Sequence, residues 1–515
     1  MKGHKSHRGR FRRLFQNVLA SLSLLAILYS LSDSKRNERV VPKRNERADA
    51  VVEAITFAFD AYWKSALAFD ELRPISQSGE NSFCNTSATL VDSLSTLWLA
   101  GLDDRFKSAR DVVAAKDYTV LANCNLFEAT IRIVGGLLSA GALSKDQMFF
   151  EKAKQVVELM MPSFNTVSGI PCNTFPLPPQ NRPPCASASI AEAGTLVMEF
   201  AYLSQVTADA SYVAAAELAM FAIASGRNKS TCLPGIYSTN VNIDDGTGQS
   251  CWGSMGGGAD SFYEYLLKIW LLTGKAQTFY PYKRMWDLSM KTTYENLLRC
   301  SDDGHLYAGS GDGTTFNSNL EHLACFLGGN MLLGDPSKYL KAAAAITESC
   351  VAMYTSSASK LGADGFAWRG SHPISKCIDA PKNHENPDGS VSSAPNLQRP
   401  ETIESLFYLY QRTRNPVYRD LGWEIFKHLN QTRVETGGFA SVWNVNQIPV
   451  SLQDKQQSFY LAEELKYALL LFEDDHRIDL DQWVFNTEAH PLPIFQPQFE
   501  SLIFGVCDNA PQVCA

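Results

Sequence analysis

The feature that most constrains this chain is a nearly unbroken succession of helical patterns from residue 48 to residue 472. Apolar residues recur there at three- and four-residue intervals, the spacing that places them on one face of an α-helix. Strand-like stretches are short and lie in connections, such as residues 437–445. We predict fourteen helices, at residues 48–66, 88–101, 105–115, 126–141, 146–161, 187–205, 210–225, 259–274, 277–298, 318–333, 336–354, 401–413, 416–430 and 456–472.

Fourteen helices in sequential pairs can close into a ring of helical hairpins, form an open bundle or stack as an α-solenoid. Solenoids are built from repeats, and no repeat of fixed period is visible here, which argues against that fold. Long connections at residues 168–184, 233–258 and 362–398 are typical of functional loops in a compact domain. We expect one all-α domain after residue 48, with the closed ring favoured over the alternatives.

Charge is unevenly distributed along the chain. The formal net charge is -8, yet residues 1–47 hold twelve Lys/Arg and three Asp/Glu, a net of +9. The remainder therefore carries about -17. An acidic body argues against a nucleic-acid-binding protein, because the phosphate backbone is bound by a basic face.

The basic tip precedes an apolar run of 18 residues, 14–31, which is at the short end of the range for a membrane-spanning helix. A cleaved signal peptide is the alternative, but no small-x-small cleavage site follows the run. The larger positive charge lies before it, which favours a cytosolic N-terminus. We predict a cytosolic basic tail at 1–13, a transmembrane signal anchor at 14–31, a charged stem at 32–47 and a lumenal domain at 48–515.

The cysteine count supports an oxidising compartment for that domain. Twelve cysteines are an even number and compatible with disulfides, and none has the spacing of a zinc site. In such a compartment the sequons at Asn85, Asn228 and Asn430 become candidate glycosylation sites.

Three carboxylates stand at positions that invite a chemical explanation. Glu128 and Arg132 are four residues apart, and so on one face of a mostly apolar helix, where a purely solvated ion pair is less expected. Asp260 follows a run of glycines, and its ordinary structural role there would be to cap the N-terminus of a helix. Glu401 follows Pro400, and its ordinary structural role would be that of an acidic residue in the first turn of a helix.

A further stretch lies near the C-terminus, where residues 485–490 read Phe-Asn-Thr-Glu-Ala-His. Thr487 and Glu488 offer hard oxygen atoms, the ligand type that suits Ca²⁺. By itself this is a weak indication of a metal site.

This stretch resembles the C-terminal signature of the class I α-1,2-mannosidases, glycoside hydrolase family 47. Other segments resemble family motifs in the same order, namely residues 127–138, 191–200, 260–268, 321–326, 399–404 and 458–467. The resemblance extends over approximately residues 50–492. The order and spacing of the motifs, more than any one of them, make it specific.

The resemblance implies an (α/α)7 barrel plugged by a C-terminal β-hairpin, with small β elements in the loops. It implies a calcium-dependent inverting exo-glycosidase that removes terminal α-1,2-linked mannose from high-mannose N-glycans and requires no oligomer. Glu128 would be the acid, and Glu401 or Asp260 the base, with Glu401 preferred. Thr487 would bind Ca²⁺ directly, and Glu463 and Glu488 would do so through waters.

The resemblance also implies a set of substrate-binding residues. His322 would lie at the pocket wall, and Glu199, rather than the neighbouring Glu192, would be the pocket residue. Cys325 and Cys350 would form a structural disulfide, whereas Cys84–Cys124 and Cys172–Cys185 are pairings that sequence leaves open. The full set of expected substrate-binding residues is Arg132, Glu199, His322, Arg399, Phe459 and Glu463.

Two positions depart from the family pattern. Ser95 stands where the family usually has Asp, and Gly258 stands where the endoplasmic reticulum enzymes carry an Arg that grips the glycan. The small residue predicts broader trimming, as in Golgi-type and fungal members. Together with the predicted anchor, the resemblance predicts a type II membrane protein of the Golgi or endoplasmic reticulum, with the Golgi favoured. The alternative is a quality-control relative that recognises mannose glycans with weak or no hydrolysis, which the loss of a carboxylate at Ser95 keeps open.

Overall fold

The computed structural model describes residues 44–176, 185–226, 232–378, 387–475 and 477–503. The predicted tail (1–13), the anchor (14–31), all but the last four residues of the stem (32–47) and the Asn228 sequon lie outside the described residues. From Arg44 onward, the described residues belong to one compact unit.

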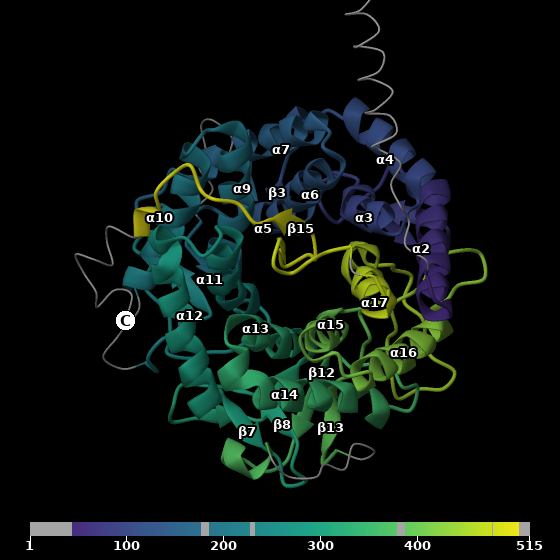
Figure 1. The fold of residues 1–515 in the computed structure, drawn as a ribbon, viewed down its shortest axis with the longest axis vertical. Coiled ribbons are helices and arrows are strands. Elements are labelled where there is room, and N and C mark those ends of the chain that lie inside the picture. The colour runs from purple at the N-terminus through teal and green to yellow at the C-terminus, as the bar shows by residue number, and fades with distance from the viewer. Residues whose placement is uncertain (1–43, 177–184, 227–231, 379–386, 476, 504–515) are drawn as a thin grey trace, which may run out of the picture. The chain divides into compact units, whose positions relative to one another are not determined.

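The described residues form a closed ring of seven inner and seven outer helices (Figure 1). Each inner helix packs against the next, and α17 closes the ring against α2 and α3. The outer helices are α2 (Glu46–Ser65), α4 (Asp103–Ala115), α7 (Gln147–Met160), α10 (Ser211–Gly226), α12 (Tyr280–Thr292), α14 (Pro336–Ser356) and α16 (Val417–Leu429). The inner helices are α3 (Ala88–Leu99), α6 (Gly135–Ser144), α9 (Val197–Thr207), α11 (Asp260–Leu272), α13 (Leu327–Gly334), α15 (Glu401–Thr413) and α17 (Leu465–Phe472). The predicted (α/α)7 barrel is confirmed.

Burial separates the two rings of helices. Inner helices are buried on nearly every side, as in α3, where Trp98 alone among twelve residues is not buried. Outer helices bury one stripe: α7 buries Phe149, Val156 and Met160 and exposes Glu151. A helix that is apolar all round belongs in a core, and an amphipathic one covers it.

Short helical pieces extend the inner helices. These are α5 (Leu126–Glu128), α8 (Ile190–Gly194), a 3₁₀ turn at His322–Phe326, and wide π-helical turns at Ala129–Val134 and Tyr460–Glu464. A third π-helical turn, Thr293–Leu297, ends α12, and further 3₁₀ turns lie at Tyr118–Val120, Met161–Phe164, Gln277–Phe279, Ile374–Lys376 and Asn430–Thr432. Single π-helical turns are often found at functional sites.

The strands are short and lie in connections. They are β1 (Glu71–Arg73), β2 (Ser78–Glu80), β3 (Cys124–Asn125), β4 (Thr174–Phe175), β5 (Ser187–Ser189), β6 (Asn240–Asn242), β7 (Leu298–Cys300), β8 (Leu306–Ala308), β9 (Ser310–Gly311), β10 (Phe316–Asn317), β11 (Asn319–Glu321), β12 (Gly365–Trp368) and β13 (Gly389–Ser393). All pair antiparallel, and β11–β12–β13 is the three-stranded sheet among them.

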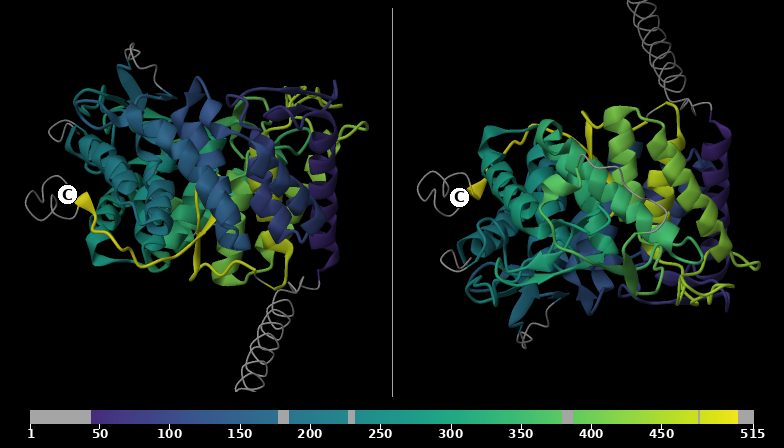
Figure 2. Two further views of the ribbon diagram at one scale, coloured as in Figure 1. Left: turned by 90° about the horizontal axis from the view of Figure 1, so that it is seen from above. Right: turned by 90° about the horizontal axis from the view of Figure 1, so that it is seen from below.

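The connections divide the ring into two unlike ends (Figure 2). We call the "loop end" the one formed by the connections from outer to inner helices, whose described residues are 66–87, 116–125, 161–176, 185–189, 232–259, 298–321, 357–378, 387–400 and 430–459. We call the "link end" the one formed by the short links from inner to outer helices, residues 100–102, 145–146, 208–210, 273–276, 335 and 414–416. Several links turn through a left-handed residue, such as Lys145, Ala208 and Arg414.

A C-terminal hairpin plugs the ring. Strands β14 (Trp483–Phe485) and β15 (Pro491–Pro493) pair with Phe485 opposite Pro491, and their loop, residues 486–490, reaches the ring axis. Ser139 Oγ on α6 donates to the Pro491 carbonyl at 2.8 Å, and Lys466 Nζ on α17 donates to the Ala489 carbonyl at 2.5 Å. The predicted hairpin plug is confirmed.

The structure corrects some predicted bounds. The run 318–333 begins with strand β11, the run 187–205 begins with β5 and breaks between α8 and α9, and the run 456–472 becomes helical near Tyr460. Residues 437–445 form isolated bridges rather than a strand. By length and composition Leu126–Ser144 could span a membrane, but it is a largely buried inner helix of the ring.

Five disulfides join cysteines of the described residues. The expected pair Cys325–Cys350 is present, as are the two pairs that sequence left open, Cys84–Cys124 and Cys172–Cys185. Cys232–Cys251 and Cys300–Cys377 complete the set.

Candidate active site

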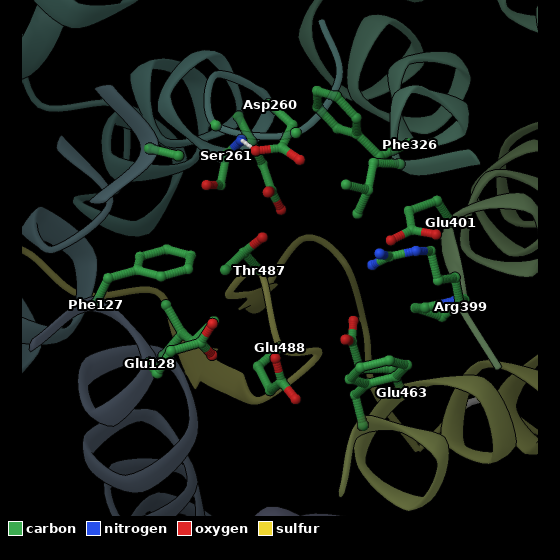
Figure 3. A pocket seen from close by; sticks show the side chains of 18 of the residues that line it. Phe127, Glu128, Asp260, Ser261, Phe326, Arg399, Glu401, Glu463, Thr487 and Glu488 are labelled. Atoms are coloured by element: carbon green, nitrogen blue, oxygen red, sulfur yellow. Dashed lines mark hydrogen bonds between the residues drawn. The ribbon is translucent and has the colours of Figure 1, made fainter. Parts of the chain in front are cut away.

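A cavity of about 300 Å³ lies where the inner helices begin, at the loop end of the ring (Figure 3). Carboxylates dominate its wall. Its lining residues are Phe127, Glu128, Ile131, Arg132, Ser189, Ala191, Glu192, Gly257, Gly258, Asp260, Ser261, Glu264, Leu323, Phe326, Arg399, Pro400, Glu401, Glu404, Phe459, Glu463, Thr487 and Glu488. All three predicted catalytic carboxylates and the three predicted metal-binding residues are among them.

The fold brings the carboxylates together because each begins an inner helix. Asp260 is the first residue of α11 and Glu401 the first of α15, while Glu128 ends the short α5 that leads into α6. The N-cap role that sequence allowed for Asp260 is not observed: Ala259 is the cap residue, no side chain caps the helix, and Asp260 Oδ1 accepts a bond of 2.8 Å from the adjacent Ser261 amide. Helix starts favour negative charge, which offsets part of the cost of gathering acids at one end of the ring.

Arg132 organises one wall of the cavity. Its Nε donates to Glu128 Oε2 at 2.9 Å, and its Nη1 is paired with Glu488. The guanidinium lies over the rings of Phe83 and Phe459, at 4.8 and 5.5 Å from their centroids. Burial disfavours this charge, but Glu488 and Glu128 outweigh burial and hold the pKa of Arg132 above its ordinary value.

A second group of acids forms the wall at α11 and α15. Lys268 Nζ is paired with Glu264 and lies 3.7 Å from Glu404 Oε1. Burial, with the charges of Glu401 and Glu264 against it, raises the pKa of Asp260 to about 7. Burial likewise raises the pKa of Glu404 to about 8, although Lys268 opposes this. This wall therefore holds more carboxyl groups than its cationic side chains can pair with.

His322 supports Glu401 from outside the cavity. Its Nδ1 donates to Glu401 Oε2 at 2.8 Å, because a carboxylate can only accept. The single lone pair of its Nε2 then accepts from the Tyr354 hydroxyl at 2.8 Å, and the Thr402 hydroxyl lies 3.2 Å from the same nitrogen. His322 was expected at the pocket wall, and the structure places it one layer behind, where it holds the carboxylate in place.

Thr487 stands at the centre of the acids, on the loop of the hairpin (Figure 3). Burial and the charges of Glu488 and Glu401 raise the pKa of Glu463 well above its ordinary value. Burial also raises the pKa of Glu488, although Arg132 opposes it. Such a set of hard oxygen atoms with excess negative charge fits a hard divalent cation.

The same residues limit how a cation could be held. Among the described residues, no group of three or more His, Cys, Asp or Glu side chains is placed to ligate a metal directly. A cation here would rely on Thr487 oxygen atoms and on water held by the surrounding acids. Calcium tolerates such mixed oxygen ligation.

The pocket role expected of Glu199 is wrong, and Glu192 takes the place at the wall. Glu199 is fully buried beneath the hairpin loop, where it accepts from Tyr265 at 2.7 Å and from Asn486 Nδ2 at 2.8 Å. Burial raises its pKa to about 7. Glu192 lines the cavity and belongs to a capping box with Ser189 at the start of α8.

Both departures from the family pattern can now be located. Ser95 Oγ lies 3.2 Å from His490 Nδ1, and His490 Nε2 lies 3.3 Å from Asp92 Oδ1. Burial lowers the pKa of His490 to about 4, so the ring is neutral and a hydroxyl at residue 95 can donate to it. Gly258 lines the cavity at φ +81°, a conformation that L side chains rarely adopt.

Several lining residues were not predicted from sequence. Glu264 and Glu404 could have been found, since they lie four and three residues after Asp260 and Glu401 and so share their helix faces. Leu323 and Phe326 lie in the 3₁₀ turn that sequence reasoning took for regular helix.

Comparison with known proteins gives one consistent result. The family model for glycosyl hydrolase family 47 matches residues 54–494. The chain is 37% identical to a mannosyl-oligosaccharide 1,2-alpha-mannosidase of Arabidopsis thaliana, over 88% of this chain and 80% of the relative. It is 35% identical to mannosyl-oligosaccharide 1,2-alpha-mannosidase IB of Mus musculus, over 88% of this chain and 70% of the relative.

A solved structure agrees with these relatives. The alpha-1,2-mannosidase from Trichoderma reesei superposes with a TM-score of 0.80 at 29% identity, covering 88% of this chain and all of that chain. With a family model that matches most of its length, the chain belongs to glycosyl hydrolase family 47.

Proposed function

We propose that this chain is a calcium-dependent, inverting α-1,2-mannosidase that trims terminal α-1,2-linked mannose from high-mannose N-glycans. The observation that carries the proposal is the cavity at the loop end, where Glu128, Asp260 and Glu401 meet around Thr487. Glycoside hydrolysis needs one carboxyl group as acid and one as base, and this cavity supplies both.

Glu128 is the proposed acid, which protonates the leaving oxygen either directly or through a water. Arg132 fixes its position by the 2.9 Å bond to Oε2. Glu128 and Glu401 stand on opposite sides of the pocket in Figure 3, an arrangement that leaves room for a water beside the sugar, as inversion requires.

Glu401 is the proposed base, which takes a proton from the attacking water. His322 holds one of its oxygens and leaves the carboxylate at the cavity wall. Asp260 is the alternative base, since its raised pKa of about 7 suits a group that takes a proton near neutral pH.

A calcium ion would be held by Thr487, with Glu463 and Glu488 ordering its waters. When bound, it would supply a positive centre that orients sugar hydroxyls and positions the attacking water. The chain's own residues do the rest of the positioning. Phe459 offers an aromatic face to a sugar ring, and Arg399, fixed by Asp364 at 2.7 Å, adds a cation to the cavity wall.

Gly258 supports broad trimming. It presents no side chain at the cavity, and an added Cβ would lie 3.2 Å from Thr239 Cγ2. Several branches of a glycan could therefore be accommodated in turn.

We place the enzyme as a type II membrane protein of the Golgi or endoplasmic reticulum. The tail at 1–13, the anchor at 14–31 and the stem at 32–47 would carry the domain at 48–515 into the lumen. Asn85 and Asn430 are exposed on the described domain, as glycosylation there requires. With an acidic body, nucleic acid is not a proposed partner, and the cavity is built by one chain alone.

The deciding experiment incubates the purified full chain with a high-mannose N-glycan, with and without a calcium chelator. Mass spectrometry follows the number of mannoses lost, and proton NMR follows the anomer that is released first. We expect stepwise loss that stops in chelator, with β-mannose released first. Release of α-mannose would contradict inversion. Binding without hydrolysis would favour the glycan-recognising alternative.

A further inference from the structure

A buried series of polar contacts leads from α3 to the cavity. Asp92 and Ser95 lie three residues apart on α3, on one helix face, and both are fully buried. Both contact the ring of His490, whose backbone belongs to the hairpin loop. Ser95 Oγ is 3.2 Å from Nδ1, and Asp92 Oδ1 is 3.3 Å from Nε2.

The chemistry of the donors fixes the direction of these bonds. The carboxylate of Asp92 can only accept, so Nε2 of His490 carries the proton. Nδ1 then has a free lone pair and accepts from the Ser95 hydroxyl. A histidine bonded at both nitrogens has one tautomer and one ring orientation, and Ser95 supplies the second of the two bonds.

The series continues from Asp92 to Arg132. Asp92 Oδ2 lies 3.7 Å from Arg132 Nη1, and that nitrogen is also paired with Glu488 and lies 3.3 Å from Ser458 Oγ. Arg132 Nε in turn holds Glu128. The orientation of Asp92 therefore bears on a guanidinium that contacts two cavity carboxylates.

We propose that Ser95 is a positioning residue for hydrolysis: its hydroxyl fixes the His490 ring, His490 orients Asp92, and Asp92 aligns the Arg132 guanidinium that holds Glu128. This inference rests on the proposed function. It gives a role in positioning to the residue that departs from the family pattern. Helix α3 would thus influence hydrolysis although neither Ser95 nor Asp92 lines the cavity.

A purely structural role is the competing explanation. The His490 ring is also confined by packing, since a Cβ added at Gly135 would lie 3.2 Å from His490 Cδ2. The His490 amide is bonded to Asn486 Oδ1 at 2.8 Å. If packing alone orients the ring, loss of the Ser95 hydroxyl would leave turnover unchanged.

The same helix offers a matched control. Ser93 is equally buried, but its hydroxyl donates to the Leu90 carbonyl of its own helix at 2.9 Å and does not contact His490. The test compares S95A, S93A and S95T in the full chain with a high-mannose N-glycan at saturating calcium. Thermal midpoints are measured alongside kcat and KM.

We expect S95A to lower kcat about fivefold with little change in KM, as loss of one orienting hydrogen bond predicts. S93A should keep the wild-type kcat, and S95T, which retains the hydroxyl, should restore kcat to within about twofold. If S95A fails to fold, S95C keeps the volume with a weak donor and should show the same fall in kcat.

Equal kcat for S95A and S93A, whether both fall or neither does, would overturn the inference. A fall in S95A that S95T does not restore would overturn it too. An inactive but folded wild-type chain would remove the proposed function itself, and that result is known before any variant is compared.

Discussion

The two ends of the ring are built from the same fourteen helices but differ in the length of their connections and in what those connections do. At the link end, inner helices turn back into outer ones within a few residues, and Asp335 alone separates α13 from α14. At the loop end the connections are long, and the cavity acids sit where the inner helices begin. Tight links preserve helix packing, whereas long loops and buried acids provide chemistry at some cost in stability.

The largest expected effect is a loss of activity on changing an acid at the loop end, with no loss on changing one at the link end. E128Q should lower kcat about 10³-fold, as loss of a general acid predicts, and should leave the thermal midpoint within a few degrees. The control is D481N, which removes an acid from a pocket at the link end. Loss of activity in D481N, or retained activity in E128Q, would contradict the division between the ends.

Calcium should stabilise the loop end selectively. At a calcium concentration of about 100 times Kd, binding adds about 3 kcal/mol to the free energy of unfolding. T487A should remove most of that increment, and the measurement is the calcium dependence of the thermal midpoint. A calcium-dependent rise of equal size in T487A would rule out Thr487 as the ligand.

The link end should respond to pH through Glu217 of α10. This buried carboxyl accepts from Ser501 Oγ at 2.5 Å, the Leu502 amide at 2.8 Å and Tyr282 at 3.2 Å, and so holds the C-terminal segment. Burial raises its pKa from 4.5 to about 7. Its contribution to stability is therefore fully present below pH 4.5 and is lost as pH rises through 7.

Over that window the loss amounts to at most about 3 kcal/mol, and E217Q should abolish it. The measurement is denaturant unfolding of wild type and variant from pH 4.5 to pH 8. Parallel pH dependences for the two proteins would show that Glu217 does not set the pH response.

The smallest expected effect concerns a single link. Ala208 ends α9 at φ 56° and is exposed, so A208G should raise the free energy of unfolding by about 1 kcal/mol by relieving left-handed strain. A214G, inside α10, should lower it by about 1 kcal/mol. Equal signs for the two changes, measured by denaturant unfolding, would contradict this account of the links.

Helical periodicity was sufficient to predict the fourteen helices, because each has to bury an apolar face. It failed where tertiary pairing decided the local structure: Asn319–Glu321 pairs with β12, so a run that reads as helical begins as a strand. The resemblance supplied the closed ring and the hairpin, which periodicity alone left open.

Sequence named most of the carboxylates that meet at the cavity, but it did not show how far each residue lies from the cavity wall. Glu192 and Glu199 are seven residues apart and would share one face of the continuous helix predicted there, so sequence did not show which reaches the cavity and which supports the hairpin. Sequence likewise did not show that His322 lies behind Glu401 rather than at the cavity wall. The contact of Ser95 with His490 spans 395 residues, and no local pattern reveals it.

Cross-links follow the same division of the ring. Cys84–Cys124 and Cys300–Cys377 each tie two neighbouring loop-end connections, while Cys172–Cys185 and Cys232–Cys251 each close a bend within one. Cys325–Cys350 differs from these four, because it joins the 3₁₀ turn before α13 to helix α14. Reducing agents would thus release the loop-end connections and one link between helical elements. A chain that matures in a reducing compartment could therefore keep its helices folded while its loop-end connections are less well fixed. The redox state of the compartment would then affect activity more than folding.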